Sequence, residues 1–125
     1  MTRKHTSATD ASTPVNVVLV TLDNHVNGAI ERAEKRLICD LPGINFKSFA
    51  ATEWEADPSA LEGCRAAIAS GDIIIVTMLF IESQIKAVSD ALAARRDHCD
   101  AMVCCMSAPE IMQFTRMGRF TMDGE

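Results

Sequence analysis

The chain has 125 residues, of which 48% are hydrophobic and 23% are charged, so it can form one globular domain with its own core. Twelve Lys and Arg residues against seventeen Asp and Glu residues give a formal net charge of −5. This acidic balance argues against binding to nucleic acid or to an anionic membrane surface. With one Trp and no Tyr, the chain also lacks the aromatic residues of a base-stacking platform.

The cysteines and the amino-terminal segment favour a reducing compartment, and we expect a cytoplasmic location. Five Cys residues without a Cys-x-x-Cys pair are typical of free thiols. The longest apolar run, residues 73–81, is about half the length that a membrane span requires. Residues 1–14 are polar and lack the apolar segment of a secretory signal, so we expect a disordered tail before a single domain at residues 15–122.

The first strand and helix of this domain follow from hydrophobic periodicity. Residues 15–22, VNVVLVTL, are almost continuously apolar and β-branched, which is typical of a strand buried on both faces. Asn24 is a candidate N-cap for an amphipathic helix that ends at Pro42-Gly43. Half-polar alternation in residues 44–51 then predicts a second strand at an edge of the sheet.

Two further strand–helix units follow. Asp57 before Pro58 predicts the start of a helix that Gly71 ends. Residues 72–79 form a second fully apolar strand. Ile81, Ile85, Val88 and Leu92 recur at helical spacing and predict a third helix that ends in charged residues.

The last unit begins with an apolar strand at residues 100–106. The sequence from Ser107 to Glu110 fits a capping box with Pro in the first turn, and it predicts a fourth helix that fades near Gly118. The residues after Gly118 are expected to be frayed.

This alternation predicts an α/β fold with a four-stranded parallel sheet in the order 2-1-3-4. Such a sheet is a flavodoxin- or Rossmann-like half with helices on both faces. In this order the apolar strand at residues 101–106 lies at an open edge, which proteins normally cover. We therefore predict that this edge is covered either by another chain or by the next strand of a larger domain, of which this sequence is the front piece.

Ligands of such sheets bind beyond the carboxyl ends of the strands, near the point where the strand order reverses. The loops there supply these candidate binding residues: Thr21, Asp23, Asn24, His25, Thr77, Met78, Phe80, Ser107 and Glu110. We expect these loops to converge in one surface region. The six glycines form neither a G-x-G-x-x-G nor a Walker loop, and no complete catalytic set or metal-ligand spacing is present. We therefore predict no catalytic residue and no metal site.

Several of these candidates also have a purely structural explanation. A lone histidine such as His25 more often bonds the local backbone than a ligand, and Asn24 and Ser107 are accounted for as helix caps. Cys104 and Cys105 are neighbours on a strand, so their side chains point to opposite faces and cannot bind one ion together.

The methionines and the single tryptophan leave two interpretations open. Five methionines have two possible roles: Met78, Met102, Met106, Met112 and Met117. They could line a flat hydrophobic ligand such as a porphyrin, or they could pack in the core, which is the interpretation that we prefer. Trp54, between Glu53 and Glu55, is expected in an exposed loop as a contact point or as a lid on the second helix.

Three segments carry a resemblance to a known family. These are VNVVLVTLDNHVNGAIERAEKRLICDLPG, ATEWEADPSALEGCRAAIASGDIIIVTMLFIESQI and CDAMVCCMSAPEIMQFTRMGRF. In this order and spacing, they resemble the N-terminal domain of the large, porphyrin-binding H subunit of the magnesium chelatase family. The resemblance covers residues 15–122.

The resemblance implies a subunit of a ligase that forms metal–nitrogen bonds in chlorophyll or bacteriochlorophyll biosynthesis, a pathway of photosynthesis. It implies protoporphyrin IX as substrate, Mg²⁺ as the inserted ion, and AAA+ motor subunits that bind ATP. The partners would be these motor subunits and the rest of the large subunit. No cofactor or catalytic residue is carried over to this piece, which is expected to be inactive alone. The alternatives are a stand-alone flavodoxin-like binding or regulatory module and a cobaltochelatase-type subunit.

Overall fold

Strands and helices alternate along the chain. A computed structural model describes residues 14–22 and 27–121. In chain order the elements are β1 (Val15–Thr21), α1 (Asn27–Asp40), β2 (Ile44–Ala50), the 3-10 turn η1 (Ala51–Glu53), α2 (Pro58–Ser70), β3 (Ile73–Thr77), α3 (Glu82–Arg95), β4 (Ala101–Cys105), α4 (Pro109–Met112), β5 (Arg116–Met117) and β6 (Phe120–Thr121). None of the described helices is long and apolar enough to cross a membrane.

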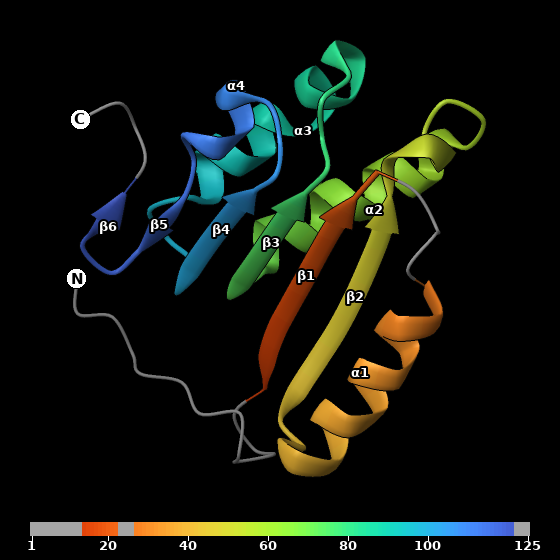
Figure 1. The fold of residues 1–125 in the computed structure, drawn as a ribbon, viewed down its shortest axis with the longest axis vertical. Helices are drawn as coiled ribbons and strands as arrows, with labels where there is room; N and C mark the ends of the chain where they lie inside the picture. The colour runs from red at the N-terminus through yellow and green to blue at the C-terminus, as the bar shows by residue number, and fades with distance from the viewer. Residues whose placement is uncertain (1–13, 23–26, 122–125) are drawn as a thin grey trace.

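The strands form one sheet in the order β2-β1-β3-β4-β5-β6 (Figure 1). The first four are parallel, which confirms the predicted order 2-1-3-4. The last two are antiparallel, so the sheet is mixed and larger than predicted. β2 lies at one edge, as its half-polar pattern indicated.

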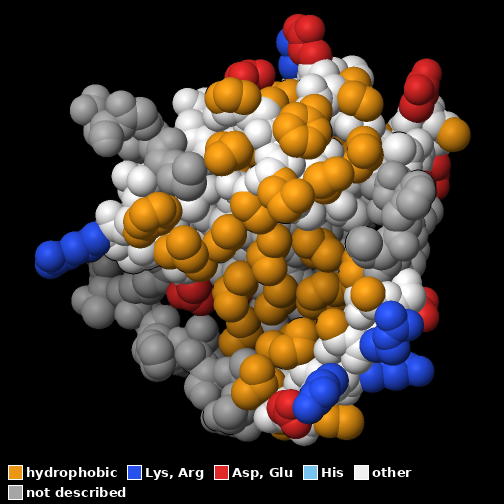
Figure 2. All heavy atoms as spheres, in the orientation of Figure 1, with side chains coloured by type: hydrophobic (Ala, Val, Ile, Leu, Met, Phe, Trp, Pro, Cys, Tyr) orange, Lys and Arg blue, Asp and Glu red, His pale blue; other side chains and the backbone are white. Residues whose placement is uncertain are grey.

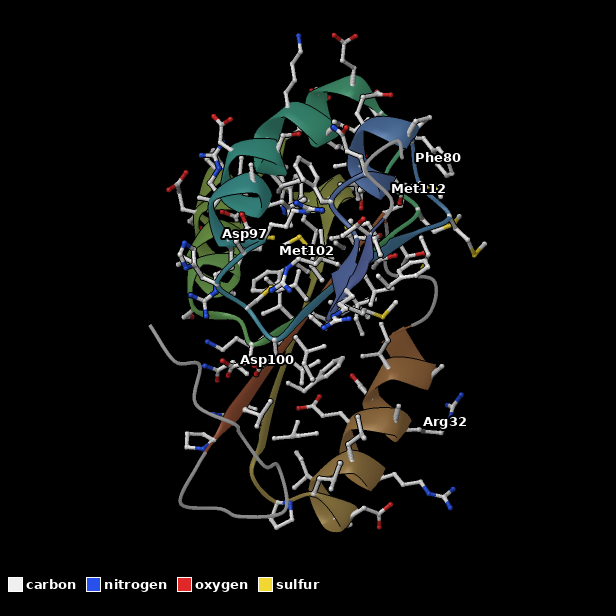
Figure 3. All side chains as sticks on the ribbon, turned by 90° about the vertical axis from the view of Figure 1, so that its left-hand side faces the viewer. Arg32, Phe80, Asp97, Asp100, Met102 and Met112 are labelled. Atoms are coloured by element: carbon white, nitrogen blue, oxygen red, sulfur yellow. The ribbon has the colours of Figure 1, made fainter. Side chains whose placement is uncertain are left out.

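Helices cover the two faces of the sheet unequally. In Figure 3, α1 lies on one side of the sheet and α2 and α3 lie on the other. The connection from β1 to β2 crosses the sheet in one direction, and the connections from β2 to β3 and from β3 to β4 cross it in the other. Because such connections are right-handed, α1 lies on one face and α2 and α3 lie on the other. The core lies between the sheet and α2 and α3, where buried members include Val18, Ile74, Met102, Ile68 and Leu92.

Local chemistry explains how α2 begins and ends. The Asp57 carboxylate accepts a hydrogen bond from the Ser59 backbone N–H at 3.1 Å, and Pro58 occupies the first turn. At the other end, a Cβ on Gly71 would lie 2.9 Å from Ile74 Cγ1. Glycine therefore allows α2 to approach β3 closely.

The carboxyl-terminal prediction was wrong. In place of a helix that fades near Gly118, α4 is a single turn and a β-hairpin follows it. Gly118 has φ of +62° in the hairpin turn, a conformation that glycine adopts without strain. The Arg116 guanidinium donates to the carbonyl oxygens of Arg96 at 3.1 Å and Cys99 at 3.0 Å, which holds the hairpin on the α3–β4 connection.

The prediction of an open β4 edge was also wrong, because the chain itself covers that edge. β5 pairs with Ala101 and Met102. Beyond this pair, the buried Thr115 hydroxyl accepts from the Cys104 N–H at 2.9 Å and donates to the Cys104 carbonyl at 3.0 Å. The Thr115 side chain thus makes the two hydrogen bonds to Cys104 that the backbone of a longer neighbouring strand would otherwise make.

All five cysteines are free thiols, in agreement with the prediction. Cys104 is buried and its neighbour Cys105 is exposed, which confirms that they point to opposite faces. Burial raises the pKa of the Cys64 and Cys104 thiols from 9.0 to about 12.

These two thiols predict alkaline destabilisation. Both thiols are protonated in either state below pH about 9, so they leave stability unchanged there. Between pH 9 and 12 the unfolded state releases their protons first, and the free energy of unfolding falls by up to about 1.4 kcal/mol per pH unit for each thiol. Urea unfolding at pH 8, 9.5 and 10.5 measures this slope. Cys64→Ala removes one thiol, and an unchanged slope in that variant would contradict the assignment.

Candidate functional site

The loops that follow β3 and β4 are bonded to each other at the carboxyl ends of the strands. The Met78 N–H donates to the Met106 carbonyl at 2.9 Å, and the Ala108 N–H donates to the Leu79 carbonyl at 2.9 Å. Between these bonds, the buried Leu79 N–H donates to the Ser107 hydroxyl at 3.1 Å. The two loops therefore form one cross-linked unit.

Two methionines in this unit have an unusual backbone. Met78 has φ of +65° and Met106 has φ of +47°, in the left-handed region that side chains other than glycine rarely adopt. Such conformations persist where surrounding bonds enforce them, and they cluster at active sites, ligand clamps and switch regions. Here the hydrogen bonds between the two loops hold Met78 and Met106 in this conformation.

Apolar side chains project from the same loops into solvent. Met78, Phe80, Ile81 and Met106 are 38%, 57%, 51% and 66% exposed, and we call these four residues the apolar rim. Phe80 lies at the periphery of the molecule in Figure 3. Large exposed apolar side chains that are close together mark contact surfaces, whereas scattered ones do not.

A cavity of about 580 Å³ adjoins the rim, between the start of α3 and the segment that follows β2. Its lining residues are Ala51, Thr52, Trp54, Glu55, Leu61, Ile81, Ser83, Gln84 and Ala87. Within the described part of the chain, the buried Trp54 Nε1 and Gln84 Oε1 have no hydrogen-bond partner. Among the residues that the structure describes, the lining includes no Lys or Arg, so they offer no cation to an acidic ligand.

The predicted site residues are only partly brought together. Met78 and Phe80 share the cross-linked unit with Ser107, and Glu110 is exposed one turn further along the chain. Thr21 is buried at the end of β1, and Thr77 is half-buried at the end of β3. Three further candidates, Asp23, Asn24 and His25, lie outside the described residues.

The capping-box interpretation of Ser107 was wrong. The N-cap of α4 is Ala108, and no side chain in the described part of the chain caps this helix. The Ser107 hydroxyl instead donates to the Cys105 carbonyl at 3.0 Å and accepts from the Leu79 N–H. The Ser107 hydroxyl therefore bonds a residue of the loop after β3 and not the start of α4, to which the local sequence pattern had assigned it.

Several apolar residues lie in other environments than the sequence pattern predicted. Trp54, expected in an exposed loop, is 6% exposed and belongs to the core. Ile81, expected on the buried face of α3, is exposed because the helix begins one residue later. The preference for core packing holds for Met102 but is wrong for Met78, Met106 and Met117, which are exposed.

The site that these residues define is a contact surface in chemical character. The rim presents thioether, phenyl and aliphatic groups, which bind by apolar burial and supply no acid or base. In the ranges 14–22 and 27–121, no group of three or more His, Cys, Asp or Glu side chains is arranged to hold a metal ion. The fold and the rim together define a doubly wound α/β domain with an apolar surface at the carboxyl ends of its strands.

Comparison with known proteins places the chain in a family. Residues 16–125 match the family described as a domain of unknown function (DUF3479), and the chain belongs to that family. It is 42% identical over 113 residues to the magnesium-chelatase H subunit of Cereibacter sphaeroides, covering 90% of this chain and 10% of that protein. It is 37% identical over 107 residues to the magnesium-chelatase H subunit of Rhodobacter capsulatus, covering 86% and 9%.

A plant relative is more distant. The chloroplastic ChlH subunit of magnesium chelatase from Oryza sativa subsp. indica is 27% identical over 111 residues, which cover 86% of this chain and 8% of that protein. The chain therefore spans a tenth or less of the length of these curated relatives.

Proposed function

We propose that this chain is the N-terminal domain of the porphyrin-binding subunit of a magnesium chelatase. The complete complex would insert Mg²⁺ into protoporphyrin IX during chlorophyll or bacteriochlorophyll biosynthesis, with ATP consumed by AAA+ motor subunits. The relatives named as H subunits of magnesium chelatase support this assignment. The five free thiols support a reducing compartment, for which we propose the cytoplasm.

Within that subunit, we assign the apolar rim to contact rather than to catalysis. The observation that carries this proposal is the pair of strained methionines, Met78 and Met106, held in exposed positions by bonds between their loops. Their side chains, with those of Phe80 and Ile81, fit either the apolar surface of the subunit body or the face of a bound porphyrin.

The test replaces two rim side chains in the complete subunit, as Phe80→Ser with Met106→Ser. Loss of two apolar anchors from an interface costs about 2 kcal/mol or more, so we expect at least about a tenfold loss in porphyrin affinity or in the rate of Mg²⁺ insertion. Porphyrin titration gives the affinity, and turnover at saturating porphyrin with the motor subunits gives the rate.

The two measurements separate the two contacts. Weaker affinity identifies a porphyrin contact, and slower turnover at unchanged affinity identifies a contact with the subunit body. Ile38→Ser is the matched control, because Ile38 is 45% exposed on α1 and is not part of the rim. Unchanged affinity and turnover in the rim variant, or an equal loss in the control, would overturn the proposal.

A further inference from the structure

One face of the sheet is apolar, and the described helices leave most of its width uncovered. The strand register places Leu19, Ile73, Ile75, Val103, Met117 and Phe120 on the face opposite α2 and α3, and we call these six residues the open face. Figure 2 looks onto this face and shows hydrophobic side chains in a broad band across the sheet. Leu19, Ile73, Ile75 and Val103 are half-buried, whereas Met117 and Phe120 are exposed.

The sequence of β3 is that of a strand covered on both faces. Its apolar run alternates between the buried Ile74 and Val76 and the half-buried Ile73 and Ile75. Continuous apolar strands of this kind occur in parallel sheets with helices on both sides. The two faces of β3 are equally apolar, yet only the face toward α2 and α3 is buried.

The described helix on the open side, α1, does not close this gap. It lies near β2, and none of its residues from 28 to 40 is buried. The helices α2 and α3 lie on the opposite face, and the single turn α4 packs its buried Ile111 into the same core as they do. Any helix over β3 to β6 on this side must therefore come from outside the described segments.

The dimensions of the uncovered area match one helix. Neighbouring strands lie roughly 4.8 Å apart, so the four strands from β3 to β6 span about 14 Å, close to the 10–12 Å diameter of a helix with its side chains. The five residues of β3 extend over about 17 Å, which corresponds to a helix of about 11 residues.

The chemistry of the face selects the type of partner. None of the described strands places Asp, Glu, Lys or Arg on this side of the sheet. Interfaces this apolar are typical of permanent packing, as in a domain core. A second copy of this chain would bring another net charge of −5, and like charges oppose self-association.

We propose that an amphipathic helix from the remaining polypeptide of the subunit packs on the open face beside α1. The relatives support this occupant, since 90% or more of their length lies outside the matched region. The proposal rests on the proposed function only in assigning this chain to a longer subunit. It concerns a different surface from the apolar rim.

Thiol labelling of the purified complete subunit tests this occupant. The reporters are Met117→Cys and Phe120→Cys on the open face, and the control is Arg32→Cys, whose native side chain projects away from the sheet in Figure 3. Peptide-resolved mass spectrometry follows each thiol separately from the native cysteines. We expect both reporters to react at least about tenfold more slowly than the control.

Protection must also persist on dilution, because a helix of the same polypeptide cannot dissociate. Reporters that react as fast as Arg32→Cys would overturn the proposal, and protection that disappears on 100-fold dilution would identify a second copy instead. If the subunit shows no magnesium insertion while both reporters remain protected, the proposed function fails and this inference stands. If the subunit inserts magnesium normally while both reporters react as fast as the control, this inference fails and the proposed function stands.

Discussion

Replacing Thr115 with Val is expected to lower the free energy of unfolding by about 2–5 kcal/mol, because it leaves both the N–H and the carbonyl of Cys104 without a hydrogen-bond partner. The Thr115 hydroxyl is 2.9 Å from the Cys104 nitrogen and 3.0 Å from its carbonyl oxygen, in a buried setting. Valine keeps the shape of the side chain but neither donates nor accepts. Such a loss is a large fraction of the stability of an ordinary domain.

Thr115→Ser is the matched control. It keeps the hydroxyl and removes one methyl group, so it should cost only about 1 kcal/mol. Urea unfolding of the two variants and the native protein supplies the comparison. If Thr115→Val proves as stable as Thr115→Ser, the paired hydrogen bonds contribute nothing.

The same substitution reopens the edge of β4. With the Cys104 groups unpaired, the strand offers a template for pairing with another chain. Sedimentation should therefore show self-association of Thr115→Val at concentrations where Thr115→Ser remains monomeric. A monomeric Thr115→Val protein would show that the β5–β6 hairpin alone protects the edge.

The parallel part of the sheet was predictable because long apolar runs carry a strong signal. β1 and β3 are uninterrupted β-branched segments, and β2 alternates as an edge strand does. Asp57 and Pro58 form a local start signal for α2 that needs no tertiary contact. In these cases the local preference and the tertiary environment agree.

The carboxyl-terminal hairpin was not predictable in the same way. Each of its strands has two residues, too few to establish a period, and Gly118 fits a helix end and a turn equally well. Its anchors are contacts with distant segments, such as the bond from Arg116 to the Arg96 carbonyl. Periodicity contains no information about such contacts.

The candidate site was located by topology and not by its residues. The rule that ligands lie at the carboxyl ends of strands led to Met78, Phe80 and Ser107, which the structure brings into one unit. Their roles could not be inferred locally. The positive φ values of Met78 and Met106 arise from bonds between two loops, and a sequence pattern does not encode them.

Ser107→Ala is expected to loosen the cross-linked loops selectively. The Ser107 hydroxyl lies 3.1 Å from the Leu79 nitrogen and 3.0 Å from the Cys105 carbonyl oxygen. Without it, the buried Leu79 N–H has no acceptor in this arrangement, a cost of about 1–3 kcal/mol. The strained conformations of Met78 and Met106 then lose one of the bonds that enforce them.

Amide hydrogen exchange distinguishes this local effect from general destabilisation. We expect Met78 and Leu79 to exchange at least about tenfold faster in Ser107→Ala, with Ile74 and Val76 in the interior of β3 much less affected. Ser89→Ala is the control, because it removes a hydroxyl that donates to the Ile85 carbonyl within α3. A uniform acceleration across β3 and the loop would show that Ser107 stabilises the whole domain. In that event, the rim would not depend on this hydroxyl for its conformation.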